Sequence, residues 1–274
     1  MLISKKDTKK GVKTLRFLLL FNPFYLNFWG TFSVPSNFSR GYFFPELRGV
    51  KFDALGNPNK YDTEKIIQGE LGVKYGAGKF SGTAALYALT LKDRKSITFV
   101  NAPGGGFTEE VDLQNSKTFG IETSWKYKFT QNFNFNGSFT FQDHEITKSE
   151  NNPEFEGNEL ARQPDFITSL GIDYDNSIFD GSFIYNYTGN KYTNDSNSIE
   201  LDAIGIANLN LGYTFSVGEG DETLRLGAQV FNLFNDSGVT EGSPRLNNNQ
   251  TEEEFFVGRP ILPTRVFLNA TFNF

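Results

Sequence analysis

The residue types that carry most enzyme chemistry are scarce in this chain. It has 274 residues, no cysteine and a single histidine, His144. With a single histidine and no cysteine, no His/Cys metal cluster is expected. Asp143 precedes His144 and suggests a hydrolase dyad, but no second catalytic pair is visible. We therefore expect His144 to be a hydrated polar residue, and we predict no catalytic, cofactor-binding or metal-binding residues.

Two other motifs have a simple structural interpretation. Gly104-Gly105-Gly106 follows Pro103, but no helix follows it, so a flexible loop tip is expected rather than a phosphate cradle. Glutamates gather between Glu150 and Glu159, and such runs are usually solvated. The better ligand candidates are four arginines at the bases of expected loops, which could contact an anionic ligand or brace the rim. They are Arg40, Arg48, Arg162 and Arg259.

The strongest pattern in the chain is the alternation from Asn132 to Gln142, NFNFNGSFTFQ. Phe133, Phe135, Phe139 and Phe141 share one parity, and polar residues occupy the other. Because successive strand side chains point to opposite faces, this segment has one apolar and one polar face. Similar aromatic-rich alternation recurs from Leu26 to the last residue, which is typical of a transmembrane β-barrel.

The composition favours the same fold class. No run of about 18 apolar residues exists that could form a membrane-spanning helix. Phenylalanine occurs 30 times and aromatic residues make up 16% of the chain, yet the mean hydropathy is negative. That combination suits an outer surface in lipid and an inner surface in water. A net charge of −6, without a basic patch beyond the first residues, argues against a nucleic-acid partner.

The alternation predicts an all-β, antiparallel barrel of about ten strands, in which long connections alternate with short ones. In outer-membrane barrels the short turns are periplasmic and the long loops extracellular, so the C-terminus is expected in the periplasm. The expected strands are 24–39, 65–75, 80–92, 117–129, 132–146, 164–175, 178–190, 203–217, 222–234 and 264–274. The expected long loops are 40–64, 93–116, 147–163, 191–202 and 235–263.

Each strand also predicts which side chains face lipid. A charge on the lipid face costs about 2–4 kcal/mol at the bilayer midplane, so charged residues should fall on the other parity. The strand 80–92 is ambiguous, because Leu86 and Leu89 have opposite parity and both are apolar. The expected lipid-facing residues elsewhere include Phe119, Ile121, Trp125, Tyr127, Phe129, Phe179, Phe183, Tyr185, Tyr187, Leu209, Leu211, Tyr213 and Phe215.

The last strand ends in a pattern of its own. Val266, Leu268, Ala270, Phe272 and Phe274 alternate, and the last of them is the final residue. This resembles the terminal signature that the outer-membrane barrel-assembly machinery reads. We therefore expect that machinery and outer-membrane lipid to be partners of the chain.

Several segments, in their order along the chain, resemble the C-terminal part of a TonB-dependent receptor barrel. Each is weak alone, but the ordered set spans about residues 25–274. The segments are Ser39 to Pro45, Ser116 to Glu122, Arg162 to Phe166, Val230 to Asp236, and Gly258-Arg259-Pro260 leading into Arg265 to Phe274.

The resemblance implies a 22-stranded barrel whose N-terminal plug fills the lumen and contacts TonB. Ten strands without a plug then indicate an open, incomplete barrel that engages TonB only through a plug missing from this chain. The implied function is TonB-dependent uptake of a scarce small-molecule ligand, of the ferric siderophore or oligosaccharide type, with no activity alone. A small closed ten-stranded porin or adhesin is the alternative, and an outer-membrane hydrolase centred on His144 is a weaker one.

The first residues bear on the domain division. Five lysines precede the apolar stretch Leu15 to Trp29 and Arg16 lies at its start, as in a signal peptide, but no Ala-x-Ala site follows. We interpret residues 1–23 as a leader or relic segment, and residues 24–274 as the barrel portion.

Overall fold

The structure is a computed structural model, and it describes residues 19–20, 24–28, 32–43, 63–101, 107–218, 220–246 and 253–274. Strands make up most of this part, and the 3-10 turn Pro153–Phe155 interrupts them. None of the helical segments described here has the length and apolarity needed to cross a membrane.

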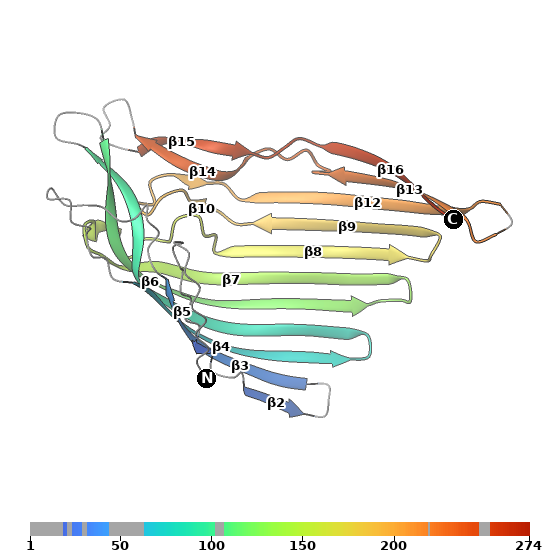
Figure 1. Ribbon diagram of the computed structural model, residues 1–274, viewed down its shortest axis with the longest axis horizontal. Coiled ribbons are helices and arrows are strands. Elements are labelled where there is room, and N and C mark those ends of the chain that lie inside the picture. Colours follow the sequence, from blue (N-terminus) through green and yellow to red (C-terminus); the bar gives the residue numbers. More distant parts are fainter. Residues whose placement is uncertain are drawn as a thin grey trace, which may run out of the picture.

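Ten long strands pair in chain order to form one antiparallel sheet (Figure 1). They correspond one to one to the ten strands that the alternation predicts, although several bounds differ. The strands are β3 (Phe32–Phe43), β4 (Glu64–Ala77), β5 (Phe80–Asn101), β6 (Phe107–Lys128), β7 (Phe133–Ser149), β8 (Phe166–Asp175), β9 (Phe179–Thr188), β12 (Ile204–Ser216), β13 (Thr223–Phe231) and β16 (Arg265–Asn273).

The predicted first strand, 24–39, is wrong as a single strand. The chain reverses within it, so that β2 (Phe24–Phe28) pairs antiparallel with β3, with Phe28 opposite Phe32. The two-residue β1 (Leu19–Leu20) pairs with the same edge of β3, opposite Arg40 and Ser39. A hairpin preserves the apolar/polar parity on both of its arms, so alternation alone did not reveal the reversal.

Three of the predicted loops contain additional strands. The expected loop 93–116 is mostly an extension of β5 and β6, which remain paired as far as Asn101 and Phe107. The other two loops contain small separate hairpins. These are β10 (Lys191–Tyr192) with β11 (Glu200–Leu201), and β14 (Val239–Leu246) with β15 (Glu253–Pro260).

The register confirms the predicted division into two faces. Residues directly opposite each other share a face, and Ile121 lies opposite both Leu86 and Phe141. In the same way, Leu209 on β12 lies opposite Phe183 on β9 and Val230 on β13. We call the face that carries these residues the apolar face and the other the polar face. Leu86 belongs to the apolar face, whereas Leu89 lies opposite Gln68 and Thr118 on the polar face.

The sheet has little hydrophobic core of its own. Among the described side chains, the buried apolar ones are Ile146, Leu160, Leu201 and Ala207. Large apolar side chains are instead exposed along the apolar face, for example Phe119 at 57% and Phe141 at 53%. A contiguous exposed apolar surface of this extent needs an apolar environment such as lipid.

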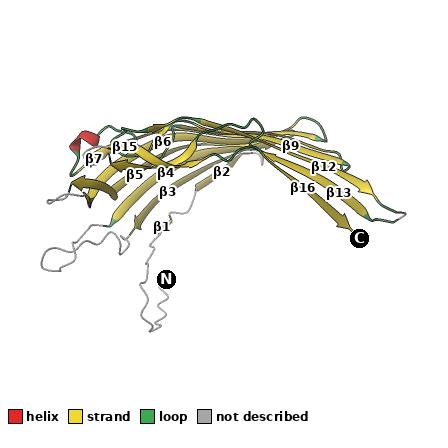
Figure 2. Ribbon diagram, turned by 90° about the horizontal axis from the view of Figure 1, so that it is seen from above, coloured by secondary structure: helices red, strands yellow, loops and turns green. Residues whose placement is uncertain are grey.

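The sheet is an open arch rather than a closed barrel (Figure 2). In the described part of the chain, β16 pairs with β13 and with no other strand, and β1 and β2 pair only with β3. The two edges therefore lie at opposite ends of the sheet in Figure 1. The closed ten-stranded alternative is not what this sheet forms.

Candidate functional site

Two long loops fold onto the polar face where β5, β6 and β7 end. We call residues 150–165 and 189–203 together the loop cover. The backbone of the first loop continues the sheet, because Ile146 donates to the Asn158 carbonyl at 2.8 Å and Gly157 donates to that of Ile146 at 2.8 Å. The second loop joins the first through Arg162, whose backbone N–H donates to the Tyr192 carbonyl at 2.7 Å.

Asp195 fixes the second loop to β5. Arg94 donates to its two carboxylate oxygens at 3.2 and 3.1 Å, and the Ser96 hydroxyl donates at 2.6 Å. The backbone N–H of Ala161 adds a contact of 3.3 Å from the first loop. Asp195 is only 6% exposed, so these donors replace the water that an exposed carboxylate would contact. Charge-assisted bonds of this kind are stronger than neutral ones.

Asp112 has the corresponding role for the first loop. It is fully buried and accepts hydrogen bonds from Ser149, from Gln114 at 3.0 Å and from the Asn151 backbone at 2.9 Å. Burial raises the pKa of Asp112, but these donors stabilise the carboxylate more, so its pKa lies below the ordinary value. Asp112 therefore stabilises the folded loop fully at pH values above the ordinary aspartate pKa. This stabilisation is lost as the pH falls through the lowered pKa of Asp112.

His144 is a structural residue beneath the loop cover. The prediction that it is hydrated is wrong, because it is 2% exposed. Its Nδ1 accepts the Leu160 backbone N–H at 3.1 Å, which leaves Nε2–H to donate to the Gln163 carbonyl at 3.1 Å. Asp143 lies opposite Phe119 on the apolar face, while His144 lies opposite Thr118. Adjacent strand residues point apart, so the two side chains form no dyad.

Glu159 is a residue of the loop cover whose negative charge is unfavourable in the folded protein. Burial raises its pKa, and repulsion from Asp165 adds to this, while His144 opposes it. Its backbone is held by Asn197, whose side chain accepts from the Glu159 N–H at 2.8 Å and donates to its carbonyl at 3.0 Å. The raised pKa means that the negative charge of Glu159 disfavours the folded loop cover.

Below the loop cover, long polar side chains cross the polar face above glycines. Tyr87 on β5 lies over Gly120 on β6 and donates to Gln142 Oε1 on β7 at 3.0 Å. A Cβ at Gly120 would collide with the Tyr87 ring. Each such bridge connects strands that are not direct neighbours.

A second bridge of this kind lies near the opposite end of the sheet. The side chain of Arg225 on β13 reaches Asp180 on β9, with its Nε 3.0 Å from Oδ1 and a second contact from the guanidinium to Oδ2. Gly212 on β12 lies between them, where a Cβ would collide with both side chains. The polar face is therefore braced at both ends.

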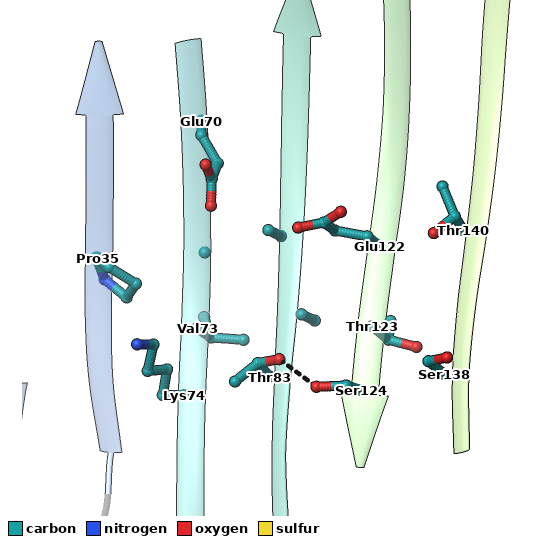
Figure 3. Close-up of a pocket in the computed structure, with 13 residues that line it drawn as sticks. Pro35, Glu70, Val73, Lys74, Thr83, Glu122, Thr123, Ser124, Ser138 and Thr140 are labelled. Carbon is teal, nitrogen blue, oxygen red and sulfur yellow. Dashed lines mark hydrogen bonds between the residues drawn. The ribbon is translucent and has the colours of Figure 1, made fainter. Parts of the chain in front are cut away.

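A hollow of about 450 Å³ opens on the polar face across β3 to β7 (Figure 3). Its lining combines small residues such as Gly72 and Ala85 with the charged residues Glu70, Lys74 and Glu122. Thr83 and Ser124 hydrogen bond within it, with 2.9 Å between their hydroxyl oxygens. It is a polar concavity in the wall, without a catalytic arrangement.

The structure does not bring together the three candidate arginines that it describes. Arg40 lies on β3 in the apolar-face register, with its guanidinium 5.0 Å from the Tyr42 ring centroid. Arg162 is exposed in the loop cover at φ 66°, and Arg259 is exposed on β15, 3.5 Å from Glu241. Arg48 lies outside the described residues. None of the three described arginines contacts another of them.

The five terminal residues that resemble an assembly signature are all exposed. Val266, Leu268, Ala270 and Phe272 share the apolar face with β13, opposite Val230, Ala228, Leu226 and Leu224. Phe274 is fully exposed and stacks on Phe272 at 6.1 Å between ring centroids.

The comparisons with known proteins agree with this architecture. The family model for the TonB dependent receptor-like β-barrel matches residues 18–233, which is more than half of the chain. No curated protein matches the sequence.

Solved structures of similar fold include two siderophore receptors and a copper transporter. BauA, the ferric preacinetobactin receptor from Acinetobacter baumannii, has a TM-score of 0.68 at 19% identity, over 91% of this chain and 35% of its own. FyuA, the ferric yersiniabactin uptake receptor from Yersinia pestis, has a TM-score of 0.68 at 17% sequence identity. The match covers 89% of this chain and 35% of FyuA. The copper transporter OprC has a TM-score of 0.69 at 15% sequence identity, and the match covers 90% of this chain and 38% of OprC. The chain thus spans about a third of the length of these proteins.

Proposed function

The chain belongs to the TonB-dependent receptor-like β-barrel family, and from this premise we propose that it is the C-terminal barrel portion of an outer-membrane uptake receptor. The family consists of receptors and transporters rather than enzymes. The observation that carries the proposal is a family match over residues 18–233 on a sheet with one exposed apolar face and one polar face. The apolar face would contact lipid, and the polar face would line the lumen.

In this proposal the barrel portion is passive. The loop cover lies at the extracellular rim, where the exposed Arg162 is available to an anionic ligand, and Arg259 occupies a similar exposed position on β15. Arg40, over Tyr42 on the apolar face, braces the rim instead. The C-terminus would then lie in the periplasm. A plug from outside residues 24–274 would close the lumen and respond to TonB.

The ligand proposed is a scarce small-molecule solute, of the ferric siderophore or oligosaccharide type. Two of the structural relatives are the receptors for ferric preacinetobactin and ferric yersiniabactin, which favours the ferric siderophore class. Residues 1–23 would be a leader or relic that precedes the barrel portion, although Leu19–Leu20 already pair with β3.

Uptake assays test this proposal. The chain would be expressed alone, and together with a plug and the preceding strands, in cells without competing receptors. Radiolabelled ferric siderophores and maltodextrins would serve as probes, with and without a protonophore. We expect energy-dependent uptake only when the plug and preceding strands are present. Energised uptake by the chain alone would contradict the proposal.

The arginines supply a second, site-level test. Arg162→Ala and Arg259→Ala should weaken binding of an anionic ferric siderophore to the complemented receptor. Lys128→Ala, at the short-turn end of β6, is a charge-matched control that should leave binding unchanged. An equal effect from all three variants would indicate net charge rather than a rim site.

A further inference from the structure

A hollow of about 350 Å³ opens on the apolar face, at the end of the sheet where short turns join β6 to β7 and β8 to β9. It lies around Gly181 on β9, which is opposite both Tyr174 on β8 and Leu211 on β12. Phe179 and Phe183, two positions before and after Gly181, share its face. One missing side chain among large apolar residues therefore creates the hollow. Its walls include Phe133, Ile172, Tyr174, Phe179, Phe183 and Leu211.

Gly181 differs from the other glycines within β7, β8, β9, β12 and β13. Each of the others lies beneath a side chain from a neighbouring strand, which an added Cβ would hit. The pairs are Gly137 with Trp125, Gly171 with Asn136, Gly205 with Tyr185, Gly212 with Arg225, and Gly227 with Asn269. At Gly181 the nearest atom to an added Cβ is the far end of the Leu211 side chain, at 3.3 Å. Among the described residues none lies across this glycine, so its space is open to a molecule outside the sheet.

Three aromatic rings border the hollow. The ring centroids of Phe133 and Tyr174 are 4.6 Å apart, and those of Tyr174 and Phe179 are 5.8 Å apart. The Tyr174 hydroxyl accepts a hydrogen bond from the Asn176 side chain at 3.1 Å, so the polar end of the ring points toward the turn. Aromatic residues concentrate at membrane interfaces, and Gly181 lies about 7 Å along the strand from Phe179. The hollow is therefore at the level where lipid acyl chains begin.

The hairpin that carries the hollow is acidic. Between Phe166 and Thr188 the sequence has three aspartates and neither lysine nor arginine. Asp180 is paired with Arg225 from β13, whereas Asp175 is exposed at the turn. This charge disfavours a head group that carries several phosphates and favours one that carries an ammonium group.

We propose that the hollow around Gly181 binds one acyl chain of an ammonium-bearing phospholipid from the periplasmic leaflet. A volume of about 350 Å³ is at the small end of the range for ligand pockets, which suits one chain rather than a whole lipid. An empty hollow in a bilayer leaves its walls without dispersion partners on one side, and a flexible chain supplies them. The choice of leaflet rests on the proposed function, which places the short turns in the periplasm.

Photo-crosslinking to a lipid probe tests this site. The full chain would be refolded into vesicles of phosphatidylethanolamine and phosphatidylglycerol that contain a trace of phosphatidylethanolamine with a diazirine in one acyl chain. Mass spectrometry of proteolytic peptides then locates the label. We expect residues 172–183 to carry more label than any other segment of the apolar face. Even labelling of that face, or preferred labelling of another segment, would overturn the proposal. Labelling the receptor with plug and preceding strands in the same way makes the result independent of the folding of the open sheet.

Variants at Gly181 test whether the hollow itself is the site. Gly181→Leu fills it, and the strand backbone there accepts a side chain if the end of Leu211 shifts slightly. The label in residues 172–183 should fall about tenfold, because roughly ten atom contacts of the seated chain are lost. Gly181→Ala should have an intermediate effect. Ala228→Leu adds similar bulk to the same face outside the walls of the hollow, and should leave the label unchanged. An equal loss in all three variants, or no loss in Gly181→Leu, would overturn the proposal.

Competition with unlabelled lipids identifies the head group. Excess phosphatidylethanolamine should reduce the label in residues 172–183 more than phosphatidylglycerol or lipid A does. Asp175→Asn should narrow this difference, because it removes the charge but keeps an oxygen for the Ser177 backbone N–H, which donates to Asp175 at 2.7 Å. Asp202→Asn, exposed in the loop cover, is the charge-matched control and should not change it. Equal or stronger competition by phosphatidylglycerol or lipid A would overturn the proposal. Failed uptake by the complemented receptor with this labelling intact would count against the proposed function alone.

Discussion

Single carboxylates hold the loop cover of this protein in place. Asp195 and Asp112 are both buried, and several hydrogen-bond donors surround each carboxylate. Glu159 lies in the same region but has the opposite character, since its charge opposes burial. The balance among these three residues decides how firmly the cover lies on the strands, and two predictions follow from it.

Asp195→Asn should release the second loop of the cover. The amide keeps the shape of the side chain but removes the charge that Arg94 and Ser96 stabilise. Hydrogen bonds to a charged group are worth roughly 1.5–3 kcal/mol, so opening should become about 10- to 100-fold more frequent. Hydrogen exchange of residues 189–203 measures this. Asp202→Asn, in the same loop but exposed, is the matched control and should change nothing.

Glu159→Gln should stabilise the loop cover at neutral pH. A carboxyl group with a raised pKa stabilises the fold fully below its unfolded pKa, and this stability is lost as pH rises through the folded pKa. The cover should therefore loosen from acid to neutral pH, and the glutamine variant should not show that component. Proteolysis of residues 150–165 across this range measures it. A wild-type profile identical to that of the variant would refute the prediction.

At the scale of the elements, glycines decide how the strands are braced. Tyr87 reaches from β5 to β7 only because Gly120 on β6 has no side chain beneath its ring. The bridge from Arg225 to Asp180 uses Gly212 in the same way. These bridges span three strands each and so resist bending of the sheet locally.

Gly120→Ala should destabilise β5 to β7 by about 1–3 kcal/mol, the usual cost of overpacking. The measurement is the denaturant midpoint in detergent, followed by the fluorescence of Trp125 on β6. Tyr87→Ser removes the ring, so the double variant Tyr87→Ser/Gly120→Ala should cost less than the sum of the two single changes. Additive effects would mean that the alanine does not meet the tyrosine.

At the scale of the whole molecule, the chain is an arch whose stability depends on its surroundings. Its apolar face is exposed and its two edges are unpaired in the described residues, so lipid and further strands must supply what a core supplies in a soluble domain.

Deleting Phe274 should prevent accumulation of the chain, or of a longer protein that contains it, in the outer membrane. Phe274 is fully exposed and contacts only the Phe272 ring among the ring contacts described, so its loss costs the folded sheet little. A large effect would therefore reflect recognition during assembly. Membrane fractionation measures it, with Phe141→Ala, another exposed apolar-face residue, as the control. Unchanged levels after the deletion would count against an assembly signal.

The sequence by itself determined the strands and their two faces. Alternation is local, and a strand such as Phe133 to Phe141 reveals its apolar parity without reference to any neighbour. The ten long strands and the side chains on each face could therefore be predicted. The open sheet was expected from the resemblance to a 22-stranded barrel rather than from the alternation. The polar face of the sheet was predictable for the same reason.

Only the tertiary structure decided the reversal before β3 and the contacts of the loop cover. A hairpin keeps the same parity on both arms, so β2 and β3 read as one strand until their register is known. Asp195 meets Arg94 across 101 positions of sequence, and no local pattern marks a partner at that distance. His144 was predicted to be hydrated because its burial depends on a loop that folds back over it. Contacts between remote segments depend on loop paths, which side-chain alternation does not encode.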